Sequence, residues 1–91
     1  MAIYVDRLRD YKWRLGPSCH LFCDPGNLEE LHAFARKLGM RRKWFQTDGD
    51  MPHYDLVSGR RLSALLYGAQ ELTNRETVDR MIAWREHAVA A

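Results

Sequence analysis

The stretch Asn27–Gln46, NLEELHAFARKLGMRRKWFQ, constrains the fold of this chain more than any other part of the sequence. Leucine and phenylalanine recur in it at spacings of three and four, which places them on one stripe of a helix. Asn27 can cap the first turn, and Glu30 can reach back to the cap amide. Gly39 is typical of the residue that ends a helix. We therefore expect a core-facing helix, followed by a strand over Arg41–Gln46.

The segments on either side alternate between apolar and polar residues, as short strands do. Further helices are predicted where capping residues precede apolar residues at helical spacing. The expected strands lie around Ile3 and Val5 and over Ser18–Asp24, His53–Val57 and Ala69–Leu72. The expected helices are Gly59–Tyr67, capped by Ser58 with Leu62, Leu65 and Leu66 facing inward, and a terminal helix after Thr73 and Glu76, marked by Val78, Met81, Ile82, Arg85 and Val89.

This order of elements predicts an α+β, or α/β, fold. A chain of 91 residues forms one small domain, here residues 1–91. We expect a mixed sheet of about four to five strands packed by about three helices.

Composition excludes several classes of protein. Apolar residues make up 46% of the chain and the net charge is only +2, which argues against disorder and makes nucleic acid a partner that is allowed but not implied. No apolar run reaches the roughly 20 residues of a membrane span, and the N-terminal residues meet charge too soon for a secretory signal. Cys19 and Cys23 would lie about 13 Å apart on one strand, too far to form a disulfide. These features predict a cytoplasmic protein with two reduced, buried cysteines.

Strand parity places five polar side chains together. Asp6, His20, Asp24, His53 and Asp55 all lie opposite the apolar residues of their strands. If the three strands are neighbours, these side chains converge on one face of the sheet. His20, His53, Asp6 and Asp55 are then candidates for general acid and base catalysis, and Asp24 could join the two histidines in binding a divalent metal. Each residue alone also has an ordinary explanation, as a hydrogen-bonded surface group.

Two basic features add ligand candidates. Arg60 and Arg61, at the start of a helix, could clamp an anion, and Gln46 is a further ligand-binding candidate. A basic and aromatic set suits phosphate contact and base stacking, or is simply a solvated helix end that runs into a charged edge strand. Its members are Arg36, Lys37 and Arg41–Trp44. The chain has three tryptophans, more than a small domain buries easily, which suggests an interface and a homodimer.

A set of short segments, in order, resembles the bacterial and bacteriophage family called domain of unknown function 4031. The resemblance covers roughly residues 3–72, and the family usually has a second acidic residue where this chain has Arg7. It implies a bacterial or phage origin and no particular activity. The segments are Tyr4-Val5-Asp6, His20-Leu21 with Asp24, Glu30 to Ala35 with Leu38-Gly39, Trp44-Phe45-Gln46, His53-Tyr54-Asp55, and Arg60-Arg61 before Gly68-Ala69.

Two functions follow as hypotheses. The first is a domain that binds or hydrolyses a phosphorylated, nucleotide-like ligand in a His/Asp/Arg pocket, with or without a divalent metal. The second is a non-enzymatic module that meets protein or nucleic acid through Arg41–Trp44. A cleft that gathers the His and Asp residues favours the first, whereas a flat, exposed basic surface favours the second.

Overall fold

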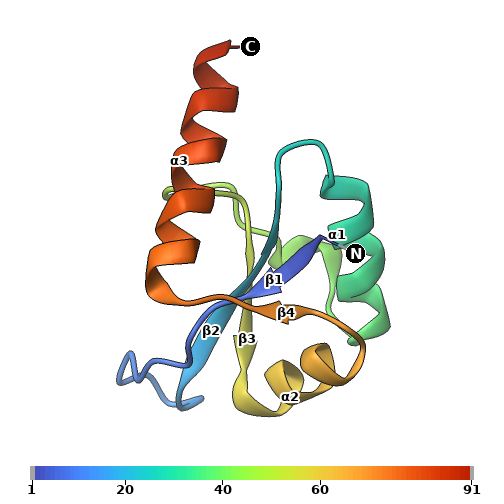
Figure 1. The fold of residues 1–91 in the computed structure, drawn as a ribbon. Helices are drawn as coiled ribbons and strands as arrows, with labels where there is room; N and C mark the ends of the chain where they lie inside the picture. Colours follow the sequence, from blue (N-terminus) through green and yellow to red (C-terminus); the bar gives the residue numbers. More distant parts are fainter. Residues whose placement is uncertain (1, 91) are drawn as a thin grey trace.

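The computed structural model describes residues 2–90 and shows a four-stranded mixed sheet with helices on both sides (Figure 1). The strands lie in the order β3-β2-β1-β4. The elements are β1 (Ile3–Val5), β2 (Ser18–Cys23), α1 (Leu28–Lys37), a 3-10 turn η1 (Arg42–Trp44), β3 (Tyr54–Val57), α2 (Ser58–Leu66), β4 (Gln70–Glu71) and α3 (Asn74–Ala90). The α+β class is thereby confirmed. Within the described residues, none of the helices is long and apolar enough to cross a membrane.

Register within the sheet brings distant parts of the chain together. β2 pairs with β1 and β3 in antiparallel fashion, whereas β4 runs parallel to β1. His20 in β2 lies directly opposite Asp55 in β3. Asp6, just past the end of β1, donates its backbone N–H to the carbonyl of His20 at 3.4 Å. Three predicted polar residues therefore meet across three adjacent strands.

One face of the sheet is closed by α1 and α2, which lie together on the same side (Figure 1). Its core is continuous and apolar because alternate residues of the strands point into it. Leu31 and Phe34 of α1 are buried there, as the helical spacing predicted. Both cysteines are free and buried on this face. Burial raises the pKa of Cys19 and Cys23 to about 12, so both stay protonated at neutral pH.

The opposite face is only partly covered, by the N-terminal half of α3. Tyr4 and Phe22 form a second, smaller apolar cluster there, against which Met81 and Trp84 of α3 pack. The indole N–H of Trp84 donates to the carbonyl of Cys23 at 2.7 Å and fixes the helix on the sheet. The C-terminal part of α3 extends beyond the sheet (Figure 1). The rest of this face is left to polar side chains.

Helix ends agree with the sequence at two positions and differ at two others. Ser58 is the first residue of α2 and not its cap, a position that Val57 occupies. Thr73 and Glu76 form the expected capping box: the Glu76 N–H donates to the Thr73 hydroxyl at 3.1 Å, and the Thr73 N–H donates to the Glu76 carboxylate at 2.9 Å. Gly39 adopts φ +79° and ends α1. Asn27 occupies the cap position of α1 but makes no side-chain cap bond.

The predicted strand Arg41–Gln46 is wrong. Arg42–Trp44 form a 3-10 turn, and only Gln46 pairs in the manner of a strand, with His53. The reason is that Arg41 begins a run of charged residues, and every residue of that run is exposed. A strand there would have had no apolar side to bury.

The inward face predicted for α2 is also wrong in part. Leu62 and Leu66 are 61% and 79% exposed, whereas Ala64 is completely buried and Leu65 packs against the core. A small residue at the contact lets α2 lie close to the sheet. On α3, Val78 and Ile82 are likewise exposed, whereas Met81 and Trp84 pack against the apolar cluster on the sheet.

A candidate metal centre beside an aromatic cleft

Strand alternation positions the polar cluster. β2 directs His20 away from the apolar core, and its antiparallel neighbour β3 directs Asp55 to the same side. His53 precedes β3 and is held by a two-way backbone pairing with Gln46, each N–H···O distance being 2.9 Å. The parity of the strands alone therefore places these side chains on one face.

Asp6 orients His20. The Nδ1 atom of His20 lies 2.7 Å from one carboxylate oxygen of Asp6, and the His20 backbone N–H donates to the other at 2.7 Å. Asp6 is almost completely buried. Because a carboxylate can only accept, Nδ1 must have the proton, and the lone pair of a neutral ring then lies on Nε2. Such carboxylate–histidine pairs are usual behind metal-binding histidines.

His53 is fixed in the same tautomer by a different partner. Its Nδ1 lies 2.9 Å from the backbone carbonyl of Met51, which can only accept a hydrogen bond. The His53 Nε2 therefore has the free lone pair. The rings of His20 and His53 meet edge to face, with centroids 4.8 Å apart.

The two Nε2 atoms and a carboxylate oxygen of Asp55 face one point. Asp55 Oδ1 lies 3.5 Å from His53 Nε2 and 4.0 Å from His20 Nε2, and all three ligand atoms lie within 4.8 Å of one another. Ligands about 2.1 Å from a tetrahedral ion are separated by about 3.4 Å. Small side-chain rotations would thus give three ligands and leave the remaining coordination positions open.

Gln46 and the nearby charged groups also act on this cluster of ligand atoms. The side-chain amide of Gln46 donates to the second oxygen of Asp55 at 2.6 Å, which leaves the first oxygen directed at the histidines. The pKa of His20 is raised, chiefly by its hydrogen bond to Asp6 and further by the charges of Asp6 and Asp55, although burial and Arg9 oppose this. The cluster therefore attracts a cation, either a proton or a metal ion.

Other predicted site residues lie elsewhere. Asp24 lies on the same face but beyond Phe22, where it accepts hydrogen bonds from Tyr4 at 2.8 Å and Arg80 at 3.3 Å. The structure does not bring Asp24 together with the two histidines, which are grouped with Asp55 instead.

The two arginines predicted as an anion clamp have different positions. Arg61 donates to the backbone carbonyl of Asp6 at 3.1 Å and is paired with Glu71, so its guanidinium is already occupied. Arg60 instead lies over the ring of Trp44, 5.4 Å from its centroid, and borders a cavity that also reaches Asp55. Of the two, Arg60 is placed to meet a ligand.

Two neighbouring hollows adjoin the cluster and are together called the cleft. One, of about 420 Å³, is bordered by His20, His53 and Tyr11. The other, of about 500 Å³, is bordered by Trp44 and Arg60, together with Lys43. Both hollows share Trp13, Gln46 and Asp55 as walls.

Sequence reasoning missed Tyr11 and Trp13 as wall residues. They belong to the β1–β2 connection, whose lack of periodicity indicated a loop and nothing more. Large aromatic side chains in a charged loop without a buried face were the available signal. Trp13 and Trp44, which the sequence suggested for a protein interface, line this cleft.

Comparison with known proteins identifies a family without a known activity. The family described as a protein of unknown function (DUF4031) matches residues 3–84. No curated protein and no solved structure matches the chain. The match extends past the segments noted in the sequence and takes in most of α3, including Trp84. The chain therefore belongs to the DUF4031 family, and its candidate metal centre and cleft lie within the part that defines that family.

Proposed function

We propose that this domain binds a divalent transition-metal ion through His20, His53 and Asp55 and uses it to bind and hydrolyse a phosphorylated, nucleotide-like molecule. The observation that supports this is the shared orientation of two imidazole Nε2 atoms and one carboxylate oxygen, with both Nδ1 atoms already bonded. Two histidines and one carboxylate with open positions are a common catalytic arrangement for zinc and for non-haem iron.

The surroundings of the cluster favour a phosphate ester as ligand. Lys43 and Arg60 line the hollow that adjoins Asp55, and the ring of Trp44 offers a flat apolar surface beside them. A bound metal would lower the pKa of a coordinated water and polarise a phosphoryl oxygen. In the hydrolysis, the water oxygen forms a bond to phosphorus, the ester P–O bond breaks, and a proton passes from the water to the departing oxygen.

The position of the cleft also concerns the second hypothesis, a non-enzymatic binding surface formed by Arg41–Trp44. Lys43 and Trp44 face the same hollow as Asp55 rather than a separate flat surface. This arrangement supports one site that includes both features. We further propose that the protein acts in the cytoplasm of bacteria or phage-infected bacteria, where buried thiols such as Cys19 and Cys23 remain reduced.

Metal binding is tested with Zn²⁺ by calorimetry and with Co²⁺ by visible absorption. The wild-type protein should bind one ion and give the intense bands of low-symmetry Co²⁺. His53→Gln and Asp55→Asn should abolish these bands, because each removes one of three ligands. His87→Gln is the matched control, since His87 is an exposed histidine on α3 outside the cluster.

Two results would contradict the metal site: no binding by the wild-type protein, or bands that persist in both ligand variants. Hydrolysis is then tested with bis-para-nitrophenyl phosphate in the presence of Zn²⁺, Mn²⁺ or Co²⁺. Turnover that disappears in His53→Gln but not in His87→Gln supports the hydrolytic role. Metal binding without any turnover would limit the site to ligand binding.

A further inference from the structure

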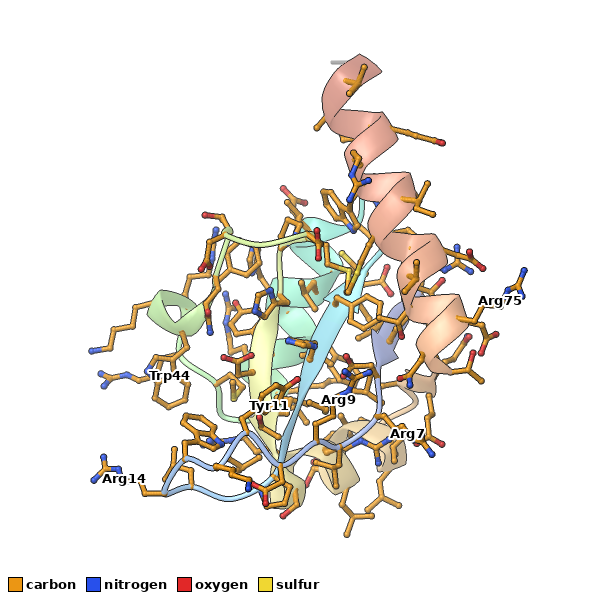
Figure 2. The ribbon with its side chains drawn as sticks, turned by 90° about the vertical axis from the view of Figure 1, so that its left-hand side faces the viewer. Arg7, Arg9, Tyr11, Arg14, Trp44 and Arg75 are labelled. Carbon is orange, nitrogen blue, oxygen red and sulfur yellow. The ribbon has the colours of Figure 1, made fainter. Side chains whose placement is uncertain are left out.

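The cleft is continuous with a basic loop that crosses the same side of the molecule. Figure 2 views this side, with Trp44 and Arg14 toward one edge, Tyr11 and Arg9 near the middle, and Arg75 at the opposite edge. Tyr11 and Trp13, in the loop between β1 and β2, border the same hollow as His20 and His53, so this loop lies alongside the candidate metal centre. A single nucleotide at that centre would leave most of this surface unused.

Charge in the loop is strongly biased. Residues 7–14, RLRDYKWR, include four cationic side chains and one acidic one, and all of them are exposed. Among the described residues, the ion pairs involve neither Arg7, Lys12 nor Arg14. A row of exposed cations without acidic partners is the electrostatic pattern that binds a phosphate backbone.

Aromatic rings alternate with these cations. Tyr11, Trp13 and Trp44 are 51%, 41% and 38% exposed, so each leaves a substantial part of an aromatic side chain accessible. Trp44 borders one hollow beside Asp55, Tyr11 borders the other and Trp13 borders both, while Arg60 covers one face of the Trp44 ring. Exposed aromatic rings beside a basic track are the combination by which proteins hold unpaired bases and their phosphates.

The loop is held in place rather than free. Arg9 pairs with Ser18 through two backbone hydrogen bonds of 2.9 Å, and the Arg9 guanidinium donates to Asn74 at 2.8 Å. The indole N–H of Trp13 donates to the carbonyl of Gly16, which fixes that ring. Pre-ordering of this kind lowers the entropy lost on binding, so the rings are suited to stacking.

We infer that the ligand of this site is a single-stranded nucleic acid. One phosphate would lie at His20, His53 and Asp55, neighbouring bases would stack on the exposed rings, and further phosphates would follow the basic loop. The strand must be single because base faces are already stacked in a duplex. This inference rests on the proposed metal-dependent function and names its substrate class.

The test is fluorescence anisotropy with labelled oligonucleotides of roughly 12 residues, within the usual range of single-strand sites. The arms are single-stranded RNA, single-stranded DNA, a duplex of the same sequence, and a free nucleotide as competitor. Single strands of one or both types should bind more tightly than the duplex. Trp13→Ala and Trp44→Ala should each weaken binding by roughly 5- to 100-fold, as the loss of one stacked base does.

Charge is tested with matched pairs. Replacing Arg7 and Arg14 together by Gln should lower the slope of log affinity against log salt by about 1.4, the value for two lost phosphate contacts on a single strand. Replacing Arg36 and Lys37 by Gln makes the same change in net charge on α1, on the other side of the sheet, and should leave the slope unchanged.

Three outcomes would overturn the inference: no binding of any oligonucleotide, a preference for the duplex, or equal effects of the two charge pairs. Intact Co²⁺ bands alongside any of these would leave the metal proposal standing, so the two failures are distinguishable. Trp13→Phe and Trp44→Phe guard against misfolding, since they keep a stacking ring and should retain most of the affinity. Thermal melts of every variant check that the fold is unchanged.

Discussion

The two faces of the sheet are built from the same strands but differ in what covers them. The face under α1 and α2 is apolar from end to end, and residues such as Leu21 and Leu56 are fully buried in it. The opposite face is apolar around Phe22, where Met51, Leu72 and α3 pack, and it is polar around His20. Because one face supplies most of the core, the other can hold ionisable groups that a core could not accept.

Two histidines, one on each face, differ in the direction in which their surroundings shift the pKa. His32, on α1, lies 2.8 Å from the Tyr54 hydroxyl and packs edge to face on Phe45. Burial, with the charge of Arg42, lowers the pKa of His32. On the opposite face, the Asp6 carboxylate raises the pKa of His20. A histidine at the edge of the core is thus kept neutral, whereas one in the polar cluster is prepared to hold a positive charge.

The largest expected effect tests the apolar face. Leu31→Ala should lower the free energy of unfolding by about 2–5 kcal/mol, because Leu31 is fully buried and its truncation leaves a cavity. Leu62→Ala is the matched control and should change it by no more than about 0.5 kcal/mol, because Leu62 is exposed on α2. Urea denaturation of both variants measures the difference. An unchanged midpoint for Leu31→Ala would show that α1 does not supply the core.

The second prediction concerns the polar face. Asp6→Asn should weaken Zn²⁺ binding by about 10- to 100-fold without removing a ligand. The amide can donate to His20 Nδ1, which would move the proton to Nε2 and take away its lone pair. Calorimetry measures the affinity, and nitrogen chemical shifts of the ring report the tautomer. An unaltered tautomer together with unaltered affinity would rule out orientation by Asp6.

The third prediction uses pH on the metal-free protein. Because the pKa of His20 is raised in the folded state, its contribution to stability is complete below the unfolded value of about 6.5 and is lost as pH rises through the folded pKa. The pKa of His32 is lowered in the folded state, so its contribution to stability is complete above the unfolded value of about 6.5. That contribution is lost as pH falls through the folded pKa.

Variants separate these two opposing effects. Asp6→Asn should remove the His20 contribution, and His32→Gln should remove that of His32. Unfolding free energies across this pH range, with chelator present, provide the measurement. The same slope in the wild-type protein and both variants would contradict the assignment.

The smallest effect concerns the thiols of the apolar face. Cys19 and Cys23 should react with iodoacetamide only slowly in the native protein, because both are buried and burial raises the pKa of each to about 12. After denaturation without reductant both should react, as free thiols do. Intact mass spectrometry counts the modified sites. Rapid labelling of the native protein would indicate that this face opens readily.

The shared face of the polar residues could be predicted from the sequence, because it depends on the alternation of side chains along each strand. Strand alternation is enough to place Asp6, His20 and Asp55 on one face, since side chains point to opposite sides with a period of two. Alternation alone did not separate Asp24 from the others, but the rise of a strand already places it about 13 Å from His20, four residues away. In the structure Asp24 bonds to Tyr4 and Arg80 instead.

Other errors came from tertiary packing. The sequence of α2 offers several leucines as its buried side, yet the contact uses Ala64, because the helix lies close to the sheet. Charged runs such as Arg41–Lys43 resemble an edge strand in composition but pair with nothing there. The course of the loop that holds Tyr11 depends on its pairing at Ser18, which no local pattern shows.

Arg61 has a consequence for the order in which the protein can be assembled. It joins the backbone of Asp6, near the start of the chain, to Glu71 beside β1, and so connects segments that are synthesised far apart in time. A nascent chain that ends before β4 lacks the partner strand on that side of Asp6. Domains form as units once their elements have emerged. The backbone of Asp6, which orients His20, is therefore joined to Glu71 through Arg61 only after β4 has been made.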